Sequence, residues 1–342
     1  MATIRIGIIG AGANTRDRHI PGLQAIEGVE IVGVCNRSRE SSEAVARKFG
    51  ISKMYEHWQL LIDDPDIDAV VIGTWPYLHC RASLAALDSG KHVLTEARMA
   101  MNASEAHAML EAAQERPDLI AQVVPSPMTL RVDRTVNRLL AEGYVGELLV
   151  VDHRQRGDFL DRDGTLHWRQ NMDLSGLNIM TMGIYYEAFM RWVGEATRVS
   201  ATGKTFVKKR RDENGRLAAV RVPEHVDVVA DLACGAQLHL QQSAVTALVE
   251  GDGTYLFGSD GVLRVVDDRL YGARRGDSAL EEISIPDEEA SGWRVEEEFI
   301  AAIRGEEPVT HTTFEDGVKY MEFTEAVAQS IATGETVALP LF

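Results

Sequence analysis

Two closely spaced glycines near the start of the chain can bring backbone amides close to a phosphate. The run Gly10-Ala11-Gly12-Ala13-Asn14-Thr15 follows a short apolar segment and precedes a segment, 16–26, that we predict to be helical. The first glycine permits a tight turn, and the second lets a pyrophosphate approach the N-terminus of the helix. Thr15 stands where the usual fingerprint has its third glycine. We predict that Gly10, Gly12, Asn14 and Thr15 bind a dinucleotide; a tight turn without a ligand is the alternative.

The residues after the next apolar segment are expected to contact the adenosine ribose of that dinucleotide. They are Asn36, Arg37 and Ser38, and the acid that binds the 2′-hydroxyl of NAD is not among them. Asn36 can still bond a hydroxyl, whereas Arg37 and Ser38 suit a 2′-phosphate. The cofactor is therefore predicted to be NADP or NAD, with NADP favoured. The alternative for Arg37 is a solvated residue at the start of a helix.

The elements that must position these residues alternate between short apolar segments and helical patterns over the first 125 residues. Between residues 106 and 113 the apolar residues recur at helical spacing, after a candidate cap at Asn102 or Ser104. Buried strands that alternate with helices predict a parallel sheet with crossover helices. The predicted strands are 4–9, 29–35, 68–73, 92–96 and 120–124.

From residue 126 onward β-rich segments follow one another with few helices between them, which predicts an antiparallel or mixed sheet. The run Asp212-Glu213-Asn214-Gly215 is typical of a hairpin tip, and the basic run 208–211 beside it is expected to be solvated. We predict a surface loop over 276–291, helices near 132–140 and 314–331, and a domain boundary at Pro125-Ser126-Pro127. The domains are then 1–125 and 126–342. The predicted strands are 148–154, 198–207, 226–232, 236–243, 254–257 and 262–266.

Composition excludes several classes of partner. The chain has 342 residues, which suits two domains, and 35 basic against 52 acidic residues give a net charge of −17. Such a charge disfavours nucleic acid and anionic membranes as partners. The sequence lacks a long apolar run and a signal-peptide pattern, so we expect no membrane span and a cytoplasmic location. Three scattered cysteines and no ligand triplet at suitable spacing predict no metal site.

Five short motifs occur along the chain in a particular order. They are 7–12 with His19-Ile20-Pro21, then 70–79, 85–96, 258–263 and 314–317. Their order resembles that of the Gfo/Idh/MocA family of glucose-fructose oxidoreductases and inositol dehydrogenases, over essentially the whole chain. The resemblance implies an α/β fold: an N-terminal Rossmann domain with a doubly wound parallel sheet, then a C-terminal α/β domain with a large, mostly antiparallel open sheet. It also implies a homodimer or homotetramer that forms through that sheet.

The resemblance further implies hydride transfer between NAD(P) and a hydroxyl or carbonyl of a sugar-like or cyclic polyol substrate. It places a group of residues beside the cofactor, although each has a structural alternative. Trp75 can simply cover the end of the sheet, His79 can cap its helix, and Glu96 can be a buried acid bonded to backbone. The group is Thr74, Trp75, Pro76, His79, Glu96 and Ala97.

The chain departs from the family at the catalytic positions. The family's Glu-Lys-Pro motif places a lysine beside the nicotinamide, but here the residues are Glu96-Ala97-Arg98, and Ala97 cannot donate a proton. The family's second motif has an acid followed four residues later by histidine. Thr181 and Tyr185 stand at these places, and some members of the family also use tyrosine at the second one.

The remaining groups suggest a hypothesis for proton transfer. Tyr185 would donate and accept the proton, Thr181 would bond the substrate, and Arg98 or His167 would assist by lowering the pKa of the tyrosine. His153 is a further candidate. The alternatives are a core position for Tyr185, a surface ion pair for Arg98 and a packed, backbone-bonded His167. Positive residues expected around the cleft are Arg37, Arg98, Arg154 and Arg169.

Three functions are compatible with this pattern. The leading one is an NAD(P)-dependent oxidoreductase with atypical acid-base residues. The second is an enzyme that uses bound NAD(P) for transient oxidation, so that the net reaction is elimination, epimerisation or glycoside cleavage. The third is a dinucleotide- or sugar-binding protein without turnover, which the changes to Ala97 and Thr181 motivate.

Overall fold

The computed structural model describes residues 3–248 and 250–342, and its contacts divide the chain into two compact units. Unit 1 comprises Met1–Pro125 and Arg294–Met321, and unit 2 comprises Ser126–Trp293 and Glu322–Phe342. The sequence division assigned residues 294–321 to the second domain, whereas the structure groups them with the first 125 residues. Contacts between residues 294–321 and the first 125 residues account for this grouping.

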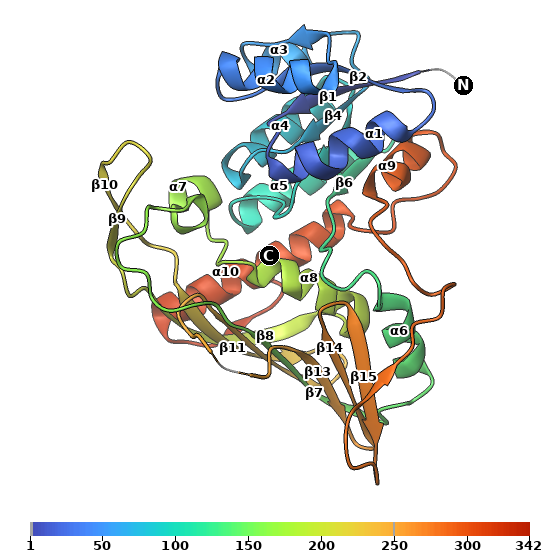
Figure 1. Cartoon of the computed structure of the whole chain (residues 1–342), viewed down its shortest axis with the longest axis vertical. Coiled ribbons are helices and arrows are strands. Elements are labelled where there is room, and N and C mark those ends of the chain that lie inside the picture. The colour runs from blue at the N-terminus through green and yellow to red at the C-terminus, as the bar shows by residue number, and fades with distance from the viewer. Residues whose placement is uncertain (1–2, 249) are drawn as a thin grey trace. The chain divides into compact units, whose positions relative to one another are not determined.

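Unit 1 contains a six-stranded parallel sheet in the order β3-β2-β1-β4-β5-β6, and the predicted doubly wound fold is confirmed (Figure 1). Ile9 at the end of β1 pairs with Cys35 and with Ile72, so three carboxyl ends meet at one edge. Ligands bind at this edge in such sheets. The strands are β1 (Ile4–Ile9), β2 (Val29–Cys35), β3 (Lys53–Met54), β4 (Ala69–Ile72), β5 (His92–Thr95) and β6 (Ala121–Val123).

The helices of unit 1 lie between these strands in the chain, except for α9, which follows the strands of unit 2. In α5 the buried stripe is Ala103, Ala106 and Met109, and the Asn102 side chain caps the helix by accepting from the Glu105 amide at 2.8 Å. The sequence alone did not decide whether Asn102 or Ser104 caps this helix. The elements are a π-helix (Thr15–His19), α1 (Ile20–Ala25), α2 (Arg39–Phe49), α3 (Trp58–Ile62), α4 (Pro76–Asp88), α5 (Ala103–Glu115) and α9 (Val295–Ile303).

Helix α9 belongs to unit 1 because buried polar contacts hold it there. The Gln122 amide on β6 donates to Glu298 at 2.7 Å, and the amide of Val123 donates to the Thr312 carbonyl at 2.9 Å. Helix α9 also lies beside α1 (Figure 1). Helix α10 (Phe314–Thr333) then carries the chain from unit 1 into unit 2.

Unit 2 contains a nine-stranded sheet in the order β16-β15-β14-β13-β7-β12-β11-β8-β17. The β7–β12 pair is parallel and the other neighbours are antiparallel, as the family resemblance implied. The strands are β7 (Leu148–Gln155), β8 (Ala196–Lys204), β11 (His225–Leu232), β12 (Gln237–Ser243), β13 (Gly253–Gly258), β14 (Gly261–Val266), β15 (Arg269–Arg274), β16 (Glu281–Ile283) and β17 (Val337–Ala338). The loop predicted over 276–291 was partly wrong, because it contains the short edge strand β16.

One face of this sheet is packed and the other is partly exposed. Tyr186 on α8 (Met182–Val193) stacks on Phe323 with ring centroids 3.6 Å apart, and its hydroxyl accepts from the Ala196 amide at 2.7 Å. On the opposite face Val229 and Phe257 are 41% and 40% exposed. The remaining helices of unit 2 are α6 (Asp133–Ala141), a 3₁₀ turn (Trp168–Gln170) and α7 (Met172–Ser175).

The predicted hairpin is present, but its basic run is not entirely solvated. Strands β9 (Lys209–Arg211) and β10 (Leu217–Ala219) pair antiparallel around the turn at Gly215, which has a φ of +76°. Arg210 is buried, and its guanidinium donates to Glu224 at 2.9 Å and to the Asp161 carbonyl at 2.7 Å. The prediction for this residue was wrong because the buried carboxylate of Glu224, beyond the hairpin, pairs with it.

The described residues, 3–248 and 250–342, include no helix long and apolar enough to cross a membrane. Within the same residues no group of three or more histidine, cysteine, aspartate or glutamate side chains is arranged to hold a metal ion.

Candidate functional site

The glycine loop after β1 packs tightly against the end of β4. Gly10 has a φ of +82°, and a Cβ built on it would stand 2.9 Å from the Thr74 amide nitrogen and 2.5 Å from Thr74 Cγ2. A Cβ on Gly12 would stand 3.2 Å from the Gly73 carbonyl oxygen. Gly10 is therefore required both by its backbone conformation and by the close approach of a neighbouring strand.

The side chains that follow the glycines support the loop from behind. The Thr15 hydroxyl is buried and donates to the Gly10 carbonyl at 3.3 Å. The Asn14 amide donates to Glu96 at 2.6 Å. Their direct contact with phosphates stays a prediction, and in this structure both side chains hold neighbouring elements together.

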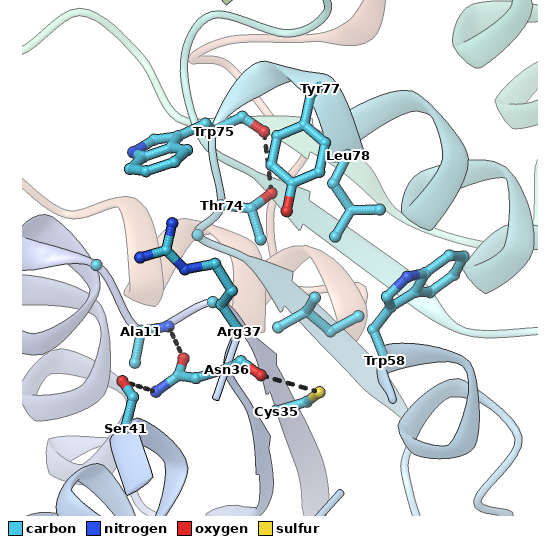
Figure 2. A pocket seen from close by; sticks show the side chains of 14 residues that line it. Ala11, Cys35, Asn36, Arg37, Ser41, Trp58, Thr74, Trp75, Tyr77 and Leu78 are labelled. Carbon is cyan, nitrogen blue, oxygen red and sulfur yellow. Dashed lines mark hydrogen bonds between the residues drawn. The ribbon is translucent and has the colours of Figure 1, made fainter. Parts of the chain in front are cut away.

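A pocket opens at the carboxyl ends of β1, β2 and β4, where the dinucleotide was expected (Figure 2). Arg37 is the one charged residue among those that line it. The lining is Ile9, Gly10, Ala11, Gly12, Cys35, Asn36, Arg37, Ser41, Trp58, Gly73, Thr74, Trp75, Tyr77 and Leu78. The glycine loop and the predicted ribose contacts Asn36 and Arg37 thus share one cavity.

The side chains at the end of β2 are ordered by hydrogen bonds. The side-chain Oδ1 of Asn36 accepts from the Ala11 backbone amide at 2.7 Å, and its Nδ2 donates to the Ser41 hydroxyl at 3.1 Å (Figure 2). The Ser38 hydroxyl caps α2 by accepting from the Ser41 amide at 3.2 Å. Asn36 therefore ties the glycine loop to the start of α2.

Aromatic residues from two helices form the rest of the wall. The Arg37 guanidinium lies 5.7 Å from the centroid of the Trp75 ring, within the range of a cation–π contact. Trp75 precedes α4, and Pro76 occupies the first turn, where a missing amide hydrogen costs little. Trp58 and Tyr77 also line the pocket.

His79 does not line this pocket. It is completely buried, with Nδ1 2.9 Å from the Arg98 carbonyl oxygen and Nε2 2.9 Å from the Thr74 carbonyl oxygen. Burial lowers the pKa of His79. The residue thereby connects the turn after β4 with the turn after β5, which places it behind the predicted cofactor site.

Glu96 stands at the end of β5 and takes part in a buried polar cluster. Its Oε1 lies 3.1 Å from Nε2 of His19, whose Nδ1 is hydrogen-bonded to Glu296 on α9. Burial lowers the pKa of His19, but its bonds to Glu296 and Glu96 outweigh this and raise it to about 9. Burial opposes ionisation of Glu96, yet His19 and Asn14 lower its pKa on balance. Glu96 is thus a carboxylate and His19 an imidazolium at neutral pH.

The two residues after Glu96 occupy different environments. Ala97 is half-buried, and Arg98 is completely buried. The alternative of a surface ion pair for Arg98 was therefore wrong, because its side chain has no exposed surface. Whether Arg98 assists the proton donor stays a prediction.

Unit 2 brings Thr181 and Tyr185 to one end of α8. Thr181 precedes the helix, its hydroxyl donates to Gln155 Oε1 at 2.7 Å, and Gln242 Oε1 lies 3.4 Å away. The half-buried Tyr185 ring lies 4.2 Å from that of His153, centroid to centroid. These residues form a polar group between the helix and the sheet.

The electrostatics around Tyr185 differ from the expectation that a cation lowers its pKa. Burial raises the pKa of Tyr185, and Asp252, Asp267 and Asp268 add to the effect. Burial lowers the pKa of the neighbouring His153 to about 3, so this histidine is neutral. Tyr185 consequently remains a protonated phenol across the neutral pH range.

His167 is exposed and has a local structural role. Its Nδ1 accepts from the Arg169 amide at 3.3 Å, and its own amide donates to Gln170 at 3.1 Å, which caps the 3₁₀ turn. Partial burial and the positive charge of Arg169 lower the pKa of His167. His167 is thus bonded to backbone but exposed and not packed, and its assistance to the proton donor stays a prediction. Arg154 pairs with Asp152 at 3.0 Å.

Comparison with known proteins decides the family. Residues 4–123 match the model described as an oxidoreductase family with an NAD-binding Rossmann fold, and residues 134–264 match the Gfo/Idh/MocA C-terminal domain. The chain belongs to the Gfo/Idh/MocA family of oxidoreductases. The resemblance inferred from the five motifs is confirmed.

Individual members of the Gfo/Idh/MocA family align over much of the chain. A 1,5-anhydro-D-fructose reductase of Ensifer adhaerens is 28% identical over 98% of both chains. Glucose-fructose oxidoreductase domain-containing protein 2 of Xenopus laevis is 30% identical over 81% of this chain and 71% of its own. A levoglucosan dehydrogenase solved with NADH and L-sorbose superposes with a TM-score of 0.84 at 22% identity, over 99% of both chains.

Several residues of this Gfo/Idh/MocA chain were not singled out from the sequence. Trp58 and Ser41 line the pocket but belong to helices that no motif marks. Gln155 and Gln242 bond Thr181 from two strands of the sheet. Glu296 follows His19 by 277 positions, so no local pattern could join them.

Proposed function

We propose that this oxidoreductase transfers a hydride between NADP or NAD and a hydroxyl or carbonyl carbon of a sugar-like or cyclic polyol substrate. The observation that carries the proposal is the pocket at the switch point between β1 and β4, where the glycine loop and Arg37 meet. Two relatives are named as a 1,5-anhydro-D-fructose reductase and a levoglucosan dehydrogenase, which supports a sugar-like substrate for this chain. The residues present fit a dinucleotide, because Gly10 and Gly12 line one pocket together with Asn36 and Arg37 at the carboxyl ends of the strands.

The bound cofactor would supply the hydride, and the chain would supply its orientation. Backbone amides of the glycine loop would hold the pyrophosphate, as they do at helix N-termini in this architecture. Asn36 and Arg37 would lie at the adenosine end, where they line the pocket together.

NADP is proposed over NAD because the pocket is lined by a cation and by no carboxylate. A 2′-phosphate would meet Arg37 and Ser41 near the start of α2, and Ser38 caps that helix. Equilibrium titrations with NADPH and NADH test this directly. Arg37→Ala should weaken NADPH binding by about 10- to 100-fold, since a hydrogen bond to a charged group contributes about 1.5–3 kcal/mol. NADH binding should change little.

Arg39→Ala is the matched control for that experiment. Arg39→Ala removes the same charge two residues later, at the first position of α2, but Arg39 is exposed and paired with Glu43 at 2.9 Å. Its substitution should leave both affinities near those of the wild type. An equal loss of NADPH and NADH binding in Arg37→Ala would contradict the preference for NADP.

Proton transfer is proposed to fall to Tyr185, with Thr181 bonding a substrate hydroxyl. Tyr185 is a protonated phenol at neutral pH and so has a proton to donate to a carbonyl oxygen, but its raised pKa makes it a weaker acid, so the proposed role needs an assisting group. Within the described residues, Nε2 of the buried His153 has no hydrogen-bond partner. Buried polar atoms without a partner are rare in folded proteins. Arg98 and His167 stay candidates for assistance, with Arg98 buried and His167 engaged in its cap.

A second function rests on Ala97. Without a lysine at this position, the chain would bind a dinucleotide or sugar and not turn it over. The remaining alternative is an enzyme that uses bound NAD(P) for transient oxidation. A panel of anhydrosugars, inositols and other carbonyl compounds, offered to the protein with NADPH, distinguishes these cases. Net oxidation of NADPH supports the oxidoreductase. Tight binding without turnover supports the binding protein, and product without net loss of cofactor supports transient oxidation.

The open face of the sheet in unit 2 is proposed to join copies of the chain into a homodimer or homotetramer. The exposed Val229, Phe257 and Leu149 support this, because apolar side chains on one sheet face are typical of an interface. Light scattering of the wild type and of Phe257→Arg tests it. A monomeric wild type would refute the proposal.

A further inference from the structure

Glu96 follows β5, the strand next to β4 in the sheet. The predicted ribose contacts follow β2, which lies on the other side of β1 and β4 in the strand order. Asn36 and Arg37 mark the adenosine end at β2, and the glycine loop after β1 marks the pyrophosphate. A dinucleotide that crosses the carboxyl ends of the strands then extends past β4 toward β5. Glu96 directly follows β5, and Asn14 of the glycine loop donates to it. The nicotinamide half would therefore approach Glu96.

His19 holds this carboxylate from within the protein. Its ring is completely buried and is bonded through Nε2 to Glu96 and through Nδ1 to Glu296. The Glu296 side chain is 2% exposed, whereas that of Glu96 is 15% exposed. The cluster thus has a buried end on α9 and a partly open end at the sheet edge.

The charges of the cluster do not cancel. The titratable groups bonded to His19 are Glu96 after β5 and Glu296 on α9, and the buried His79 on α4 contributes to the lowered pKa of Glu96. Two carboxylates and one imidazolium leave one net negative charge. When His19 loses its proton, the cluster gains a second negative charge.

We propose that His19 is a positioning residue of the cofactor site, which holds the Glu96 carboxylate beside the nicotinamide and thereby sets the relative affinity for oxidised and reduced cofactor. The inference rests on the proposed function, since it needs a bound NAD(P). The oxidised nicotinamide ring carries a positive charge and the reduced ring is neutral. A negative cluster in a low-dielectric environment therefore favours the oxidised form.

The test measures dissociation constants of NADP⁺ and NADPH for the full chain by calorimetry, from below pH 6.5 to above pH 9, the range over which His19 titrates. The ratio of the two constants cancels the titration of the phosphates, which both forms share. In the wild type this ratio, oxidised over reduced, should fall by about tenfold as His19 loses its proton, equivalent to about 1.4 kcal/mol.

Three variants make the result specific. His19→Gln should abolish the dependence of the ratio on pH. Glu296→Gln keeps a hydrogen-bond acceptor for His19 but removes a charge, so the transition should move to lower pH. Glu298→Gln is the matched control: it removes another buried carboxylate from α9, one that bonds Gln122 and Thr310 and not His19. Its ratio should follow the wild type.

The outcomes separate the inference from the function on which it rests. If both forms bind and the ratio depends on pH equally in the wild type and in His19→Gln, the inference is wrong. If His19→Gln does not fold, an unmoved transition in Glu296→Gln overturns it instead. If the wild type binds neither NADP⁺ nor NADPH, the proposed function itself fails.

Discussion

Gly10→Ala tests whether the loop after β1 is built for a cofactor. The substitution places an alanine at a φ of +82°, which costs about 1–2 kcal/mol for an L-residue. The new Cβ also stands 2.9 Å from the Thr74 amide nitrogen, so the loop or β4 must move. Overpacking of this kind costs a further 1–3 kcal/mol or so, which gives about 2–5 kcal/mol in total.

Gly50→Ala is the matched control, because it separates backbone strain from steric displacement. Gly50 ends α2 with a φ of +71°, and a Cβ there would meet no atom within 4 Å. The control should lose only the strain energy, about 1–2 kcal/mol. In thermal unfolding a loss of 1 kcal/mol lowers the midpoint by roughly 2–4 °C in a domain of this size.

The assay combines thermal unfolding with titration of NADPH by fluorescence. Gly10→Ala should unfold at a lower temperature than Gly50→Ala and should bind NADPH at least about tenfold more weakly, because displaced amides lose hydrogen bonds to charged phosphates. Gly50→Ala should bind as the wild type does. Equal NADPH affinity in the two variants would refute the view that this loop holds the pyrophosphate.

Three further predictions concern other parts of the chain. Tyr185→Phe should lower the turnover of an identified carbonyl substrate by about 100-fold or more without changing the affinity for NADPH. Unchanged turnover in steady-state kinetics would contradict the role of Tyr185 as proton donor. Glu224→Gln should lower the free energy of unfolding by about 3–5 kcal/mol in urea denaturation, because it leaves Arg210 buried without its carboxylate; a loss below about 1 kcal/mol would show that the pair is dispensable. The pKa of His19 is raised from 6.5 to about 9 on folding, so its stabilising contribution is complete below pH 6.5 and is lost as pH rises through 9. His19→Gln should remove this loss of stability at alkaline pH, and a persistent loss would assign it to another group.

The sequence was sufficient for the elements whose apolar pattern is continuous. Strands β1 and β2 match the predicted ranges because both are nearly fully buried runs of β-branched residues. Strand β16 was missed because two of its three residues are exposed glutamates, a composition typical of a loop. Local pattern thus located most of the buried strands but missed β16 and its inner neighbour β15, which begins and ends with an arginine.

Part of the candidate site was also predictable from local sequence patterns. Gly10, Gly12 and the end of β2 carry their information in local spacing, and the structure brings them into one pocket. The Glu96 cluster depends on His19 and on Glu296, which is supplied by a segment that returns to unit 1 late in the chain. The raised pKa of Tyr185 follows from burial, which a single sequence does not reveal.

The central claim is hydride transfer from a bound nicotinamide to a sugar-like carbonyl. It is tested most directly by a reaction with NADPH that carries deuterium in its transferable position, offered with the carbonyl sugar that the screen identifies. The account predicts that deuterium appears on the product carbon in an amount equal to the NADPH oxidised. Saturable binding of NADPH with no label in any product would contradict it.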